Sequence, residues 1–246
     1  MSSKSSIEWT EHTWNPTVGC TKISPGCKHC YAETMAHRPQ AMGIPEYENG
    51  FKLRLVPERL NEPLKRKKPT MYFVNSMSDL FHREVPFAFL DQVFDVIRQS
   101  PQHIFQILTK RADRMEMYFA GREVPVNAWL GVSVEDQKYG VPRIEVLRRI
   151  EAKVRFLSVE PLLESLGTLV LAGVHWVIVG GESGPGARPM EPIWAEELLR
   201  QCQDAGIPFF FKQWGAYGPD GVRRSKKENG RTLGDKEWNQ FPVSNI

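Results

Sequence analysis

The sequence has little cysteine, no long apolar run and no large excess of either charge. Its 246 residues include only 4 cysteines, which excludes the disulfide framework of a small secreted domain. No apolar run approaches the about 20 residues that cross a bilayer, and the polar start Met1–Ser6 lacks the apolar segment of a secretory signal. We therefore expect a soluble cytoplasmic protein with no membrane partner.

Neither disorder nor a strongly cationic surface fits the composition. The chain has 32 basic and 29 acidic residues, a formal net charge of +3 and 41% hydrophobic residues. This balance excludes a disordered chain and a cationic coat that wraps duplex DNA, although it permits an anionic partner. Because the apolar content is enough for one large core, we expect a single domain over residues 1–246.

Short apolar runs alternate with stretches of helical spacing through the middle of the chain. A helix is predicted after Pro86, where apolar residues recur at helical spacing. The predicted strands are Met71–Val74, Ile104–Leu108, Trp129–Val134, Val154–Val159, His175–Val179 and Pro208–Phe211. Because continuous apolar strands are typical of a parallel sheet covered by helices, the pattern predicts an α/β fold. Residues 17–20 are predicted as an additional first strand.

Two stretches interrupt this alternation. Residues 38–68 contain four prolines and the basic run Lys65–Lys68, and are predicted as an irregular insertion. The basic run could contribute to a rim for nucleic acid. Residues 215–246 are predicted as a C-terminal arm, in which Trp238 and Phe241 pack on the body of the domain.

Three of the four cysteines fall within eleven residues and form a Cys-x6-Cys-x2-Cys motif. Cys20, Cys27 and Cys30 share one polar loop, in which the turn-forming residues 24–26 let the first cysteine approach the other two. Thiolates suit zinc and iron–sulfur clusters. A structural zinc ion wants four protein ligands, whereas a cubane cluster held by only three cysteines leaves one iron open.

A zinc knuckle is the alternative interpretation of this loop. Its fourth ligand would be His12, His29 or His37. Cys202 stands apart from the motif on a predicted amphipathic helix, and we expect it to be a small core residue.

The cysteine loop, the aromatic His29 before its last cysteine and the following β/α alternation resemble the radical S-adenosylmethionine superfamily. More closely, four segments resemble an uncharacterised phage-associated three-cysteine family found in phage and mobile DNA. These segments are Ile7–Cys20, Phe73–His82, Phe156–Pro161 and Val179–Pro189. The resemblance spans roughly residues 5–215.

This resemblance implies a partial parallel β/α barrel of about six strands, TIM-barrel-like, with a 4Fe-4S cluster at its mouth. Cys20, Cys27 and Cys30 would hold the cluster, and S-adenosylmethionine would bind the open iron. Reductive cleavage would give a 5′-deoxyadenosyl radical that modifies or repairs an unidentified substrate, with nucleic acid or a nucleotide as the leading candidate. An electron donor for the cluster and a protein partner encoded nearby are the other expected partners. Most of the superfamily separates the first two cysteines by three residues, whereas this chain separates them by six.

Polar residues follow several predicted strands at their carboxyl ends, where parallel β/α proteins gather functional groups. Their carboxylates, hydroxyls and glycine backbone could contact the ammonium and ribose of S-adenosylmethionine. The expected cofactor contacts are Asn75, Ser76, Asp79, Ser133, Glu135, Glu160, Gly181 and Glu182. The expected substrate contacts are Trp14, Asn15, Lys212 and Trp214. No catalytic residue is assigned.

Two functions without catalysis remain open. The chain could be a zinc- or cluster-containing module that binds nucleic acid, or a metal-free scaffold that works with a neighbouring protein. Metal identity separates these alternatives, because iron with acid-labile sulfide favours the enzyme and stoichiometric zinc favours the binding module.

Overall fold

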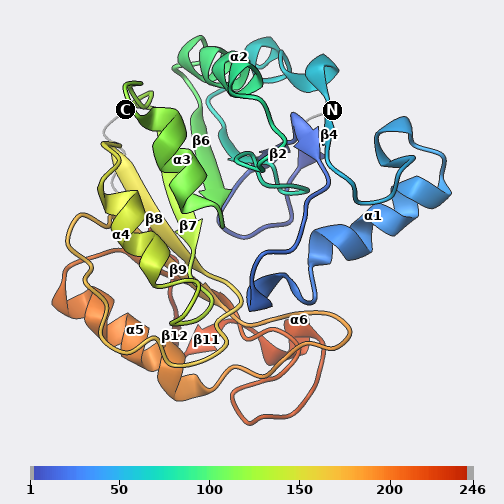
Figure 1. Ribbon diagram of the computed structural model, residues 1–246. Coiled ribbons are helices and arrows are strands. Elements are labelled where there is room, and N and C mark those ends of the chain that lie inside the picture. Colours follow the sequence, from blue (N-terminus) through green and yellow to red (C-terminus); the bar gives the residue numbers. More distant parts are fainter. Residues whose placement is uncertain (1–2, 243–246) are drawn as a thin grey trace. The chain divides into compact units, whose positions relative to one another are not determined.

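The computed structural model describes residues 3–242 (Figure 1). Residues 1–2 and 243–246, the tips of the predicted domain and of its C-terminal arm, lie outside the described residues. Within the described chain, the main sheet has eight strands in the order β1-β2-β5-β6-β7-β8-β9-β10. These strands are β1 (Ser3–Lys4), β2 (His12–Trp14), β5 (Met71–Val74), β6 (Ile104–Thr109), β7 (Ala128–Ser133), β8 (Val154–Val159), β9 (Trp176–Gly180) and β10 (Phe209–Gln213).

The strand order follows the chain from β2 to β10, which is the connectivity of a parallel β/α barrel. β1 pairs antiparallel with β2, whereas β2, β5 and β6 pair parallel, as do β8, β9 and β10. The predicted fold class, α/β with a partial parallel barrel, is therefore confirmed. The six strands predicted between residues 71 and 211 agree with the observed strands to within two residues at each end.

The chain divides into two compact units. The first unit comprises Met1–Ile23, Cys30–Gly131 and Arg149–Lys153. The second unit comprises Ser24–His29, Val132–Arg148 and Val154–Ile246. Each unit is described below by itself.

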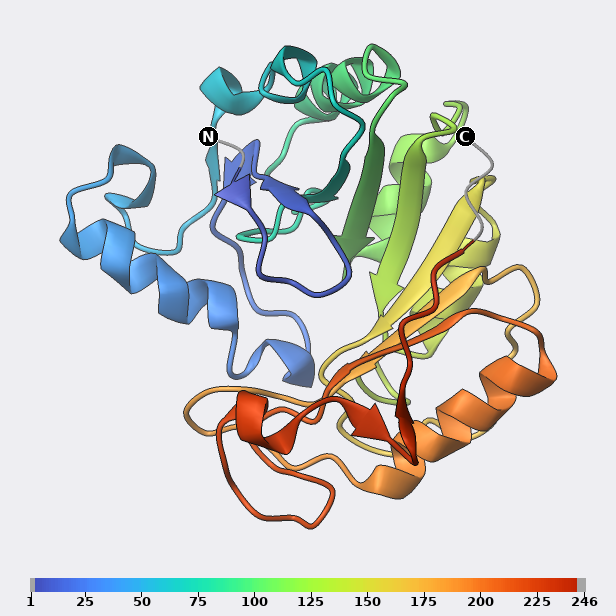
Figure 2. The ribbon, with the colours of Figure 1, turned by 180° about the vertical axis from the view of Figure 1, so that it is seen from behind.

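The helices begin and end where the sequence supplies the signals. They are α1 (Tyr31–Ala41), α2 (Phe87–Arg98), α3 (Ala112–Phe119), α4 (Pro142–Arg148), α5 (Pro192–Asp204) and α6 (Lys226–Asn229). Pro192 opens α5 and Gly206, with φ of 64°, follows its end, as expected for residues that start and stop helices. Within the first unit, α2 and α3 cover one face of β6 (Figures 1 and 2). None of the described helices has both the length and the apolar character needed to cross a bilayer.

The segment 17–20, predicted as the first strand, is not part of the main sheet, although its first two residues form a strand. The first parallel strand is β2, which pairs with β5 through His12 and Tyr72. Thr17–Val18 forms the short strand β3, which pairs antiparallel with β4 (Arg54–Leu55) in a separate sheet. Pro16 lies between β2 and β3, and because proline has no amide hydrogen it cannot extend the ladder.

The segment predicted as an insertion, residues 38–68, contains the end of α1, strand β4 and three single-turn helices. The single turns are Pro45–Tyr47, Pro57–Arg59 and Pro63–Lys65. Each begins at a proline, since its fixed φ suits the first helical position and its missing amide hydrogen is not needed there. The basic run Lys65–Lys68 lies before β5, at the amino end of that strand.

In the second unit, the described part of the C-terminal arm folds back on β9 and β10. It contains α6 and the antiparallel pair β11 (Thr232–Leu233) and β12 (Lys236–Glu237). The Trp238 ring lies 6.2 Å from that of Phe209, and the Phe241 ring lies 5.0 Å from that of Trp176. Both aromatic side chains therefore pack on the body, as expected from the sequence.

Trp14 ends β2 and is fully buried in the first unit. Its relative exposure is 0%, and its ring meets that of Phe105 edge to face at 5.6 Å. The indole Nε1 donates a 2.7 Å hydrogen bond to the carbonyl of Arg59, which ties the insertion to the strand. This environment gives Trp14 a packing role.

Replacing Trp14 by phenylalanine should lower the free energy of unfolding by about 1–3 kcal/mol, because the Arg59 carbonyl loses its buried donor and part of the ring volume is vacated. Urea-induced unfolding measures the change. The control is Trp194→Phe, a half-buried position on α5, where a change within about 0.5 kcal/mol is expected. Equal losses in the two variants would contradict the packing role.

Candidate functional site

Carboxylates stand at the carboxyl ends of four strands, and each is paired with a basic side chain. The pairs, with their nitrogen-to-oxygen distances, are Asp79–Arg111 (2.9 Å), Glu135–Arg143 (2.6 Å), Glu160–Lys212 (2.8 Å) and Glu182–Arg188 (2.6 Å). The first pair belongs to the first unit and the other three belong to the second. A carboxylate removed from water without a cation or hydrogen-bond donors would be strongly destabilising. The strand ends therefore carry ion pairs rather than lone acids.

In the first unit, the segment that follows β5 holds the chain that leads to Cys20. The Asn75 side chain donates to Thr17 Oγ1 at 2.8 Å and accepts from the Thr17 amide at 3.3 Å. Asn15 Oδ1 accepts from the Ser76 hydroxyl at 3.2 Å. Asn75 has φ of 61°, a left-handed conformation that asparagine adopts more readily than most residues. Three residues expected at a binding site thus fix this segment in place.

Arg111 connects Asp79 with the first cysteine of the motif. Its Nη1 donates to Asp79 Oδ2 at 2.9 Å and lies 3.5 Å from Cys20 Sγ, while its Nη2 donates to the Thr21 carbonyl at 2.9 Å. Burial lowers the pKa of Arg111, but the charges of Asp79 and Cys20 outweigh burial and hold the pKa above its ordinary value. A guanidinium this close to a sulfur stabilises the thiolate form.

The residue after Cys30 is bound to the segment after β5. Cys30 precedes α1, and its carbonyl accepts from the Thr34 amide at 3.1 Å. The next residue, Tyr31, donates its hydroxyl to the carbonyl of Ser76. The start of α1 is therefore tied to the residues that also hold the chain before Cys20.

In the second unit, Cys27 ends a single helical turn, Pro25–Cys27. Its amide donates to the Ser24 carbonyl at 3.0 Å, and its Sγ lies 3.7 Å from the Ser24 hydroxyl. Cys27 is half-buried, as are the other two cysteines of the motif, and none of the three forms a disulfide bond. Among the residues that the structure describes, no group of three or more His, Cys, Asp and Glu side chains is arranged to hold a metal ion, so the ligand assignment belongs to the proposal below.

Cys202 lies on α5 and is 1% exposed. Burial raises the pKa of its thiol to about 12. The prediction that it is a core residue is confirmed, and its protonated thiol has no character of a metal ligand.

The Glu160–Lys212 pair joins the ends of β8 and β10. Glu160 Oε2 accepts from the Ser158 hydroxyl at 3.1 Å, and Oε1 lies 2.8 Å from Lys212 Nζ. Lys212, an expected substrate contact, thus places its ammonium group on an expected cofactor contact. Both side chains keep some exposure, 20% for Lys212 and 15% for Glu160, so the pair is accessible to a bound molecule.

Glu182 and Gly181 follow β9. Glu182 accepts three hydrogen bonds from Arg188, from the backbone amide at 2.9 Å, from Nε at 2.8 Å and from Nη2 at 2.6 Å. Burial raises the pKa of Glu182, but the hydrogen bonds and charge of Arg188 outweigh burial and hold the pKa below its ordinary value. A Cβ at Gly181 would overlap the Trp214 carbonyl oxygen, so close chain packing requires glycine here.

Three other predicted site residues are buried among protein groups. Trp214 is 3% exposed, and its Nε1 donates to the Thr232 carbonyl at 2.8 Å. Ser133 is 2% exposed, and its carbonyl accepts from Arg143 at 2.7 Å. Together with the fully buried Trp14, these residues hold the surrounding chain and present little surface to a ligand.

The sequence analysis assigned no role at the cofactor site to the basic partners Arg111, Arg143 and Arg188. A usable signal existed for Arg111, because Thr109, Lys110 and Arg111 continue the rule that polar residues follow a strand end. No comparable signal marks Arg143, which lies inside α4. Its role follows only from the fold.

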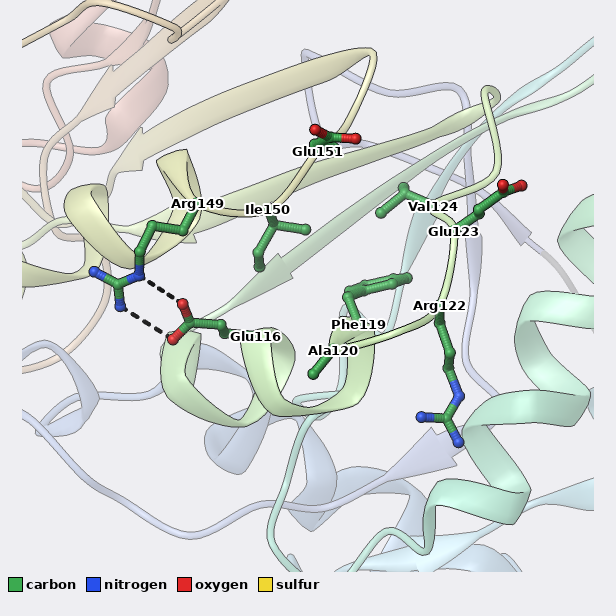
Figure 3. Close-up of a pocket in the computed structure, with 9 residues that line it drawn as sticks. All are labelled: Glu116, Phe119, Ala120, Arg122, Glu123, Val124, Arg149, Ile150 and Glu151. Atoms are coloured by element: carbon green, nitrogen blue, oxygen red, sulfur yellow. Dashed lines mark hydrogen bonds and ion pairs between the residues drawn. The ribbon is translucent and has the colours of Figure 1, made fainter.

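A cavity of about 610 Å³ lies elsewhere in the first unit (Figure 3). It is lined by Glu116, Phe119, Ala120, Arg122, Glu123, Val124, Arg149, Ile150 and Glu151. These residues precede β7 and β8 in the chain, so they belong to the amino ends of the strands. Arg149 binds Glu116 with two hydrogen bonds, at 2.6 and 3.0 Å, and mixed charge lines the remainder. Within the first unit, this cavity is therefore lined by other residues than the Asp79–Arg111 pair.

Comparisons with solved structures identify the fold. Spore photoproduct lyase complexed with dinucleoside spore photoproduct matches with a TM-score of 0.52 and 12% identity, over 82% of this chain and 63% of that chain. A mutant of that enzyme with bound AdoMet and dinucleoside spore photoproduct matches with a TM-score of 0.50 and 12% identity, over 73% of this chain and 58% of that chain. At this identity the likeness shows a shared fold.

The chain spans less than two thirds of these lyase chains, 63% of one and 58% of the other. No curated protein matches it. The profile of one protein family matches nearly the whole chain, over residues 4–242. The chain therefore belongs to the family described as "Protein of unknown function (DUF5131)".

Proposed function

We propose that this protein is a radical S-adenosylmethionine-type iron–sulfur enzyme that modifies or repairs a nucleic acid or nucleotide. The observation that carries the proposal is the set of three half-buried cysteines within eleven residues, none of them in a disulfide bond, in the loop that follows the first parallel strand of this fold. The likeness to a lyase structure that contains bound AdoMet supports it. The closer relation to a phage-associated three-cysteine family is part of the same proposal.

By the chemistry of its donors, three cysteine sulfurs, the motif suits a 4Fe-4S cluster. Cys20, Cys27 and Cys30 would hold it, and thiolate is the ligand that such clusters use. The guanidinium of Arg111 beside Cys20 favours the thiolate that ligation requires, and it would donate to that sulfur after ligation. When bound, the cluster would supply the electron that cleaves S-adenosylmethionine to a 5′-deoxyadenosyl radical.

The strand-end residues form the proposed cofactor side of the site. S-Adenosylmethionine carries a sulfonium and an ammonium group, so it needs acceptors whose negative charge is not wholly neutralised. Glu160 and Glu182 suit direct contact, because in each the Oε1 oxygen contacts a single basic group, that of Lys212 or Arg188. Asp79 acts through Arg111, since its oxygens already accept from Phe81, Thr109, Lys110 and Arg111.

A nucleic acid or nucleotide substrate is supported by two observations. The related lyase structures contain a dinucleoside photoproduct, and Arg83, Lys110 and Arg111 follow β5 and β6 at their carboxyl ends. The Lys65–Lys68 run contributes less to this proposal, because it lies at the amino end of β5. Asn15 and Lys212 are the proposed substrate contacts that retain exposed surface.

Anaerobic reconstitution of the full chain with iron and sulfide, followed by reduction with S-adenosylmethionine, tests the proposed function. The expected results are about four iron and four sulfide per chain and formation of 5′-deoxyadenosine. Stoichiometric zinc without iron would identify a binding module instead. A chain that binds neither metal would act as a scaffold, and either result would end the enzymatic proposal.

Substituting any one of Cys20, Cys27 or Cys30 by alanine should abolish retention of the cluster, because each supplies one of three protein ligands. Iron and sulfide per chain after desalting measure the loss. Cys202→Ala is the control and should keep the iron content of the wild type, since its buried thiol stays protonated. Equal iron loss in all four variants would contradict the ligand assignment.

Glu182→Gln should weaken binding of S-adenosylmethionine by about tenfold without removing iron, because Arg188 would keep its charge with no carboxylate beside a cationic ligand. Equilibrium binding to the reconstituted protein measures the affinity. Glu197→Gln is the matched control, since Glu197 accepts from Ser165 in the same unit but does not follow a strand. Wild-type affinity in both variants would remove the assigned role of Glu182.

A further inference from the structure

The six residues between Cys20 and Cys27 include a turn that docks on a buried carboxylate of the second unit. Glu135 is 0% exposed, and its Oε1 accepts from the Ser24 hydroxyl. Its Oε2 accepts from Arg143 Nη1 at 2.6 Å, and the same nitrogen donates to the Ser133 carbonyl at 2.7 Å. Arg143 therefore fixes the carboxylate against β7 and leaves the other oxygen directed at the cysteine loop.

Gly26 meets the same side chain. A Cβ at this position would lie 2.9 Å from Glu135 Cγ, closer than real Cβ atoms approach such a neighbour, and 3.0 Å from Oε1, which is also a tight contact. Its φ lies outside the left-handed region, so the backbone alone would accept alanine. The requirement for glycine thus comes from the contact with Glu135.

The position of this turn determines the position of Cys27. The amides of Cys27 and Lys28 donate to the carbonyls of Ser24 and Pro25 at 3.0 and 3.1 Å, and the Ser24 hydroxyl lies 3.7 Å from Cys27 Sγ. Beyond Cys27, the His29 ring packs over Gly186, where a Cβ would lie 2.9 Å from the ring. The segment is therefore held before and after the cysteine.

We propose that Glu135, oriented by Arg143, is a positioning residue that clamps the Ser24–Gly26 turn and so presents Cys27 as a cluster ligand. The clamp itself is inferred from the contacts of Glu135 with Ser24 and Gly26. Its role in cluster binding by Cys27 rests on the proposed function. A purely structural ion pair is a weak explanation, because the desolvation of two buried charges offsets much of their attraction. The hydroxyl and the glycine that meet Glu135 both lie within the longer cysteine spacing of this chain.

The test uses Ser24→Ala, which removes the hydroxyl and leaves the Glu135–Arg143 pair intact. The matched control is Ser165→Ala, which removes a serine-to-glutamate hydrogen bond of 2.8 Å elsewhere in the second unit. In the metal-free full chain, hydrogen exchange of residues 21–30 should be about tenfold faster in Ser24→Ala. In the reconstituted chain, iron release to a chelator should be about tenfold faster as well. Ser165→Ala should match the wild type in both measurements.

Wild-type exchange over residues 21–30 in Ser24→Ala would overturn the clamp. Faster exchange with wild-type iron release would overturn its role in ligation. Gly26→Ala should push the turn off Glu135 and accelerate both processes, and wild-type behaviour of this variant would also contradict the clamp. If the wild-type chain retains no iron, the proposed function fails, and the exchange of the metal-free chain still decides whether the clamp exists. Hydrogen exchange outside residues 21–30 should match the wild type in Ser24→Ala, which separates a local clamp from a general loss of stability.

Discussion

A carboxylate that is removed from water at the end of a strand loses favourable hydration, and a nearby cation compensates for that loss. The described chain has four such pairs at its strand ends. Asp79, Glu135, Glu160 and Glu182 each have a basic partner within 2.9 Å. An isolated buried charge would be far more costly than a satisfied one, so each cation has to stay where the carboxylate is. Groups that contact either member of a pair are then held relative to a strand of the sheet. The strand ends thus serve as fixed points for flexible loops.

Two of these ion pairs, Asp79–Arg111 and Glu135–Arg143, contact residues of the cysteine loop, and the two contacts differ in their chemistry. In the first unit, Asp79 holds the guanidinium of Arg111 beside Cys20 Sγ. In the second unit, Glu135 accepts from the Ser24 hydroxyl, which lies next to Cys27 Sγ. A cation beside one sulfur and a hydroxyl beside another would affect a bound cluster differently, because hydrogen bonds and charge at the sulfurs set its reduction potential. The residues that hold the cysteine loop in place would therefore also influence the reduction potential of a bound cluster.

The sequence predicts the strands well because each is a continuous apolar run, and the bounds of Met71–Val74 and Val154–Val159 agree with the structure at both ends. It misplaces the first strand because His12–Trp14 has no apolar run, and only its pairing with β5 makes it a strand. The strand-end carboxylates can be predicted together with the strands, because functional polar residues are expected directly after each predicted strand. Their pairing with cations is harder to predict, since Arg111 lies 32 residues from Asp79 and its place after β6 does not show which carboxylate it binds. Trp14 was likewise assigned to a substrate from its place near the cysteines, whereas burial and a hydrogen bond to Arg59 determine its role.

The wide spacing of the first two cysteines and the buried acid after β7 can be understood as one feature. With only three residues between the first two cysteines, the loop could not contain the Ser24–Gly26 turn as well as the residues that connect it to Cys20. The hydroxyl of Ser24, from which Glu135 accepts a hydrogen bond, would then be lost. Losing a buried hydrogen bond to a charged group costs about 1.5–3 kcal/mol, a cost that a related chain could avoid by replacing the acid. Conversely, a chain that keeps the acid gains a fixed point for a longer loop and needs a glycine where the loop passes it, as Gly26 does here. Loop length, serine, glycine, acid and arginine are therefore expected to change together among related proteins.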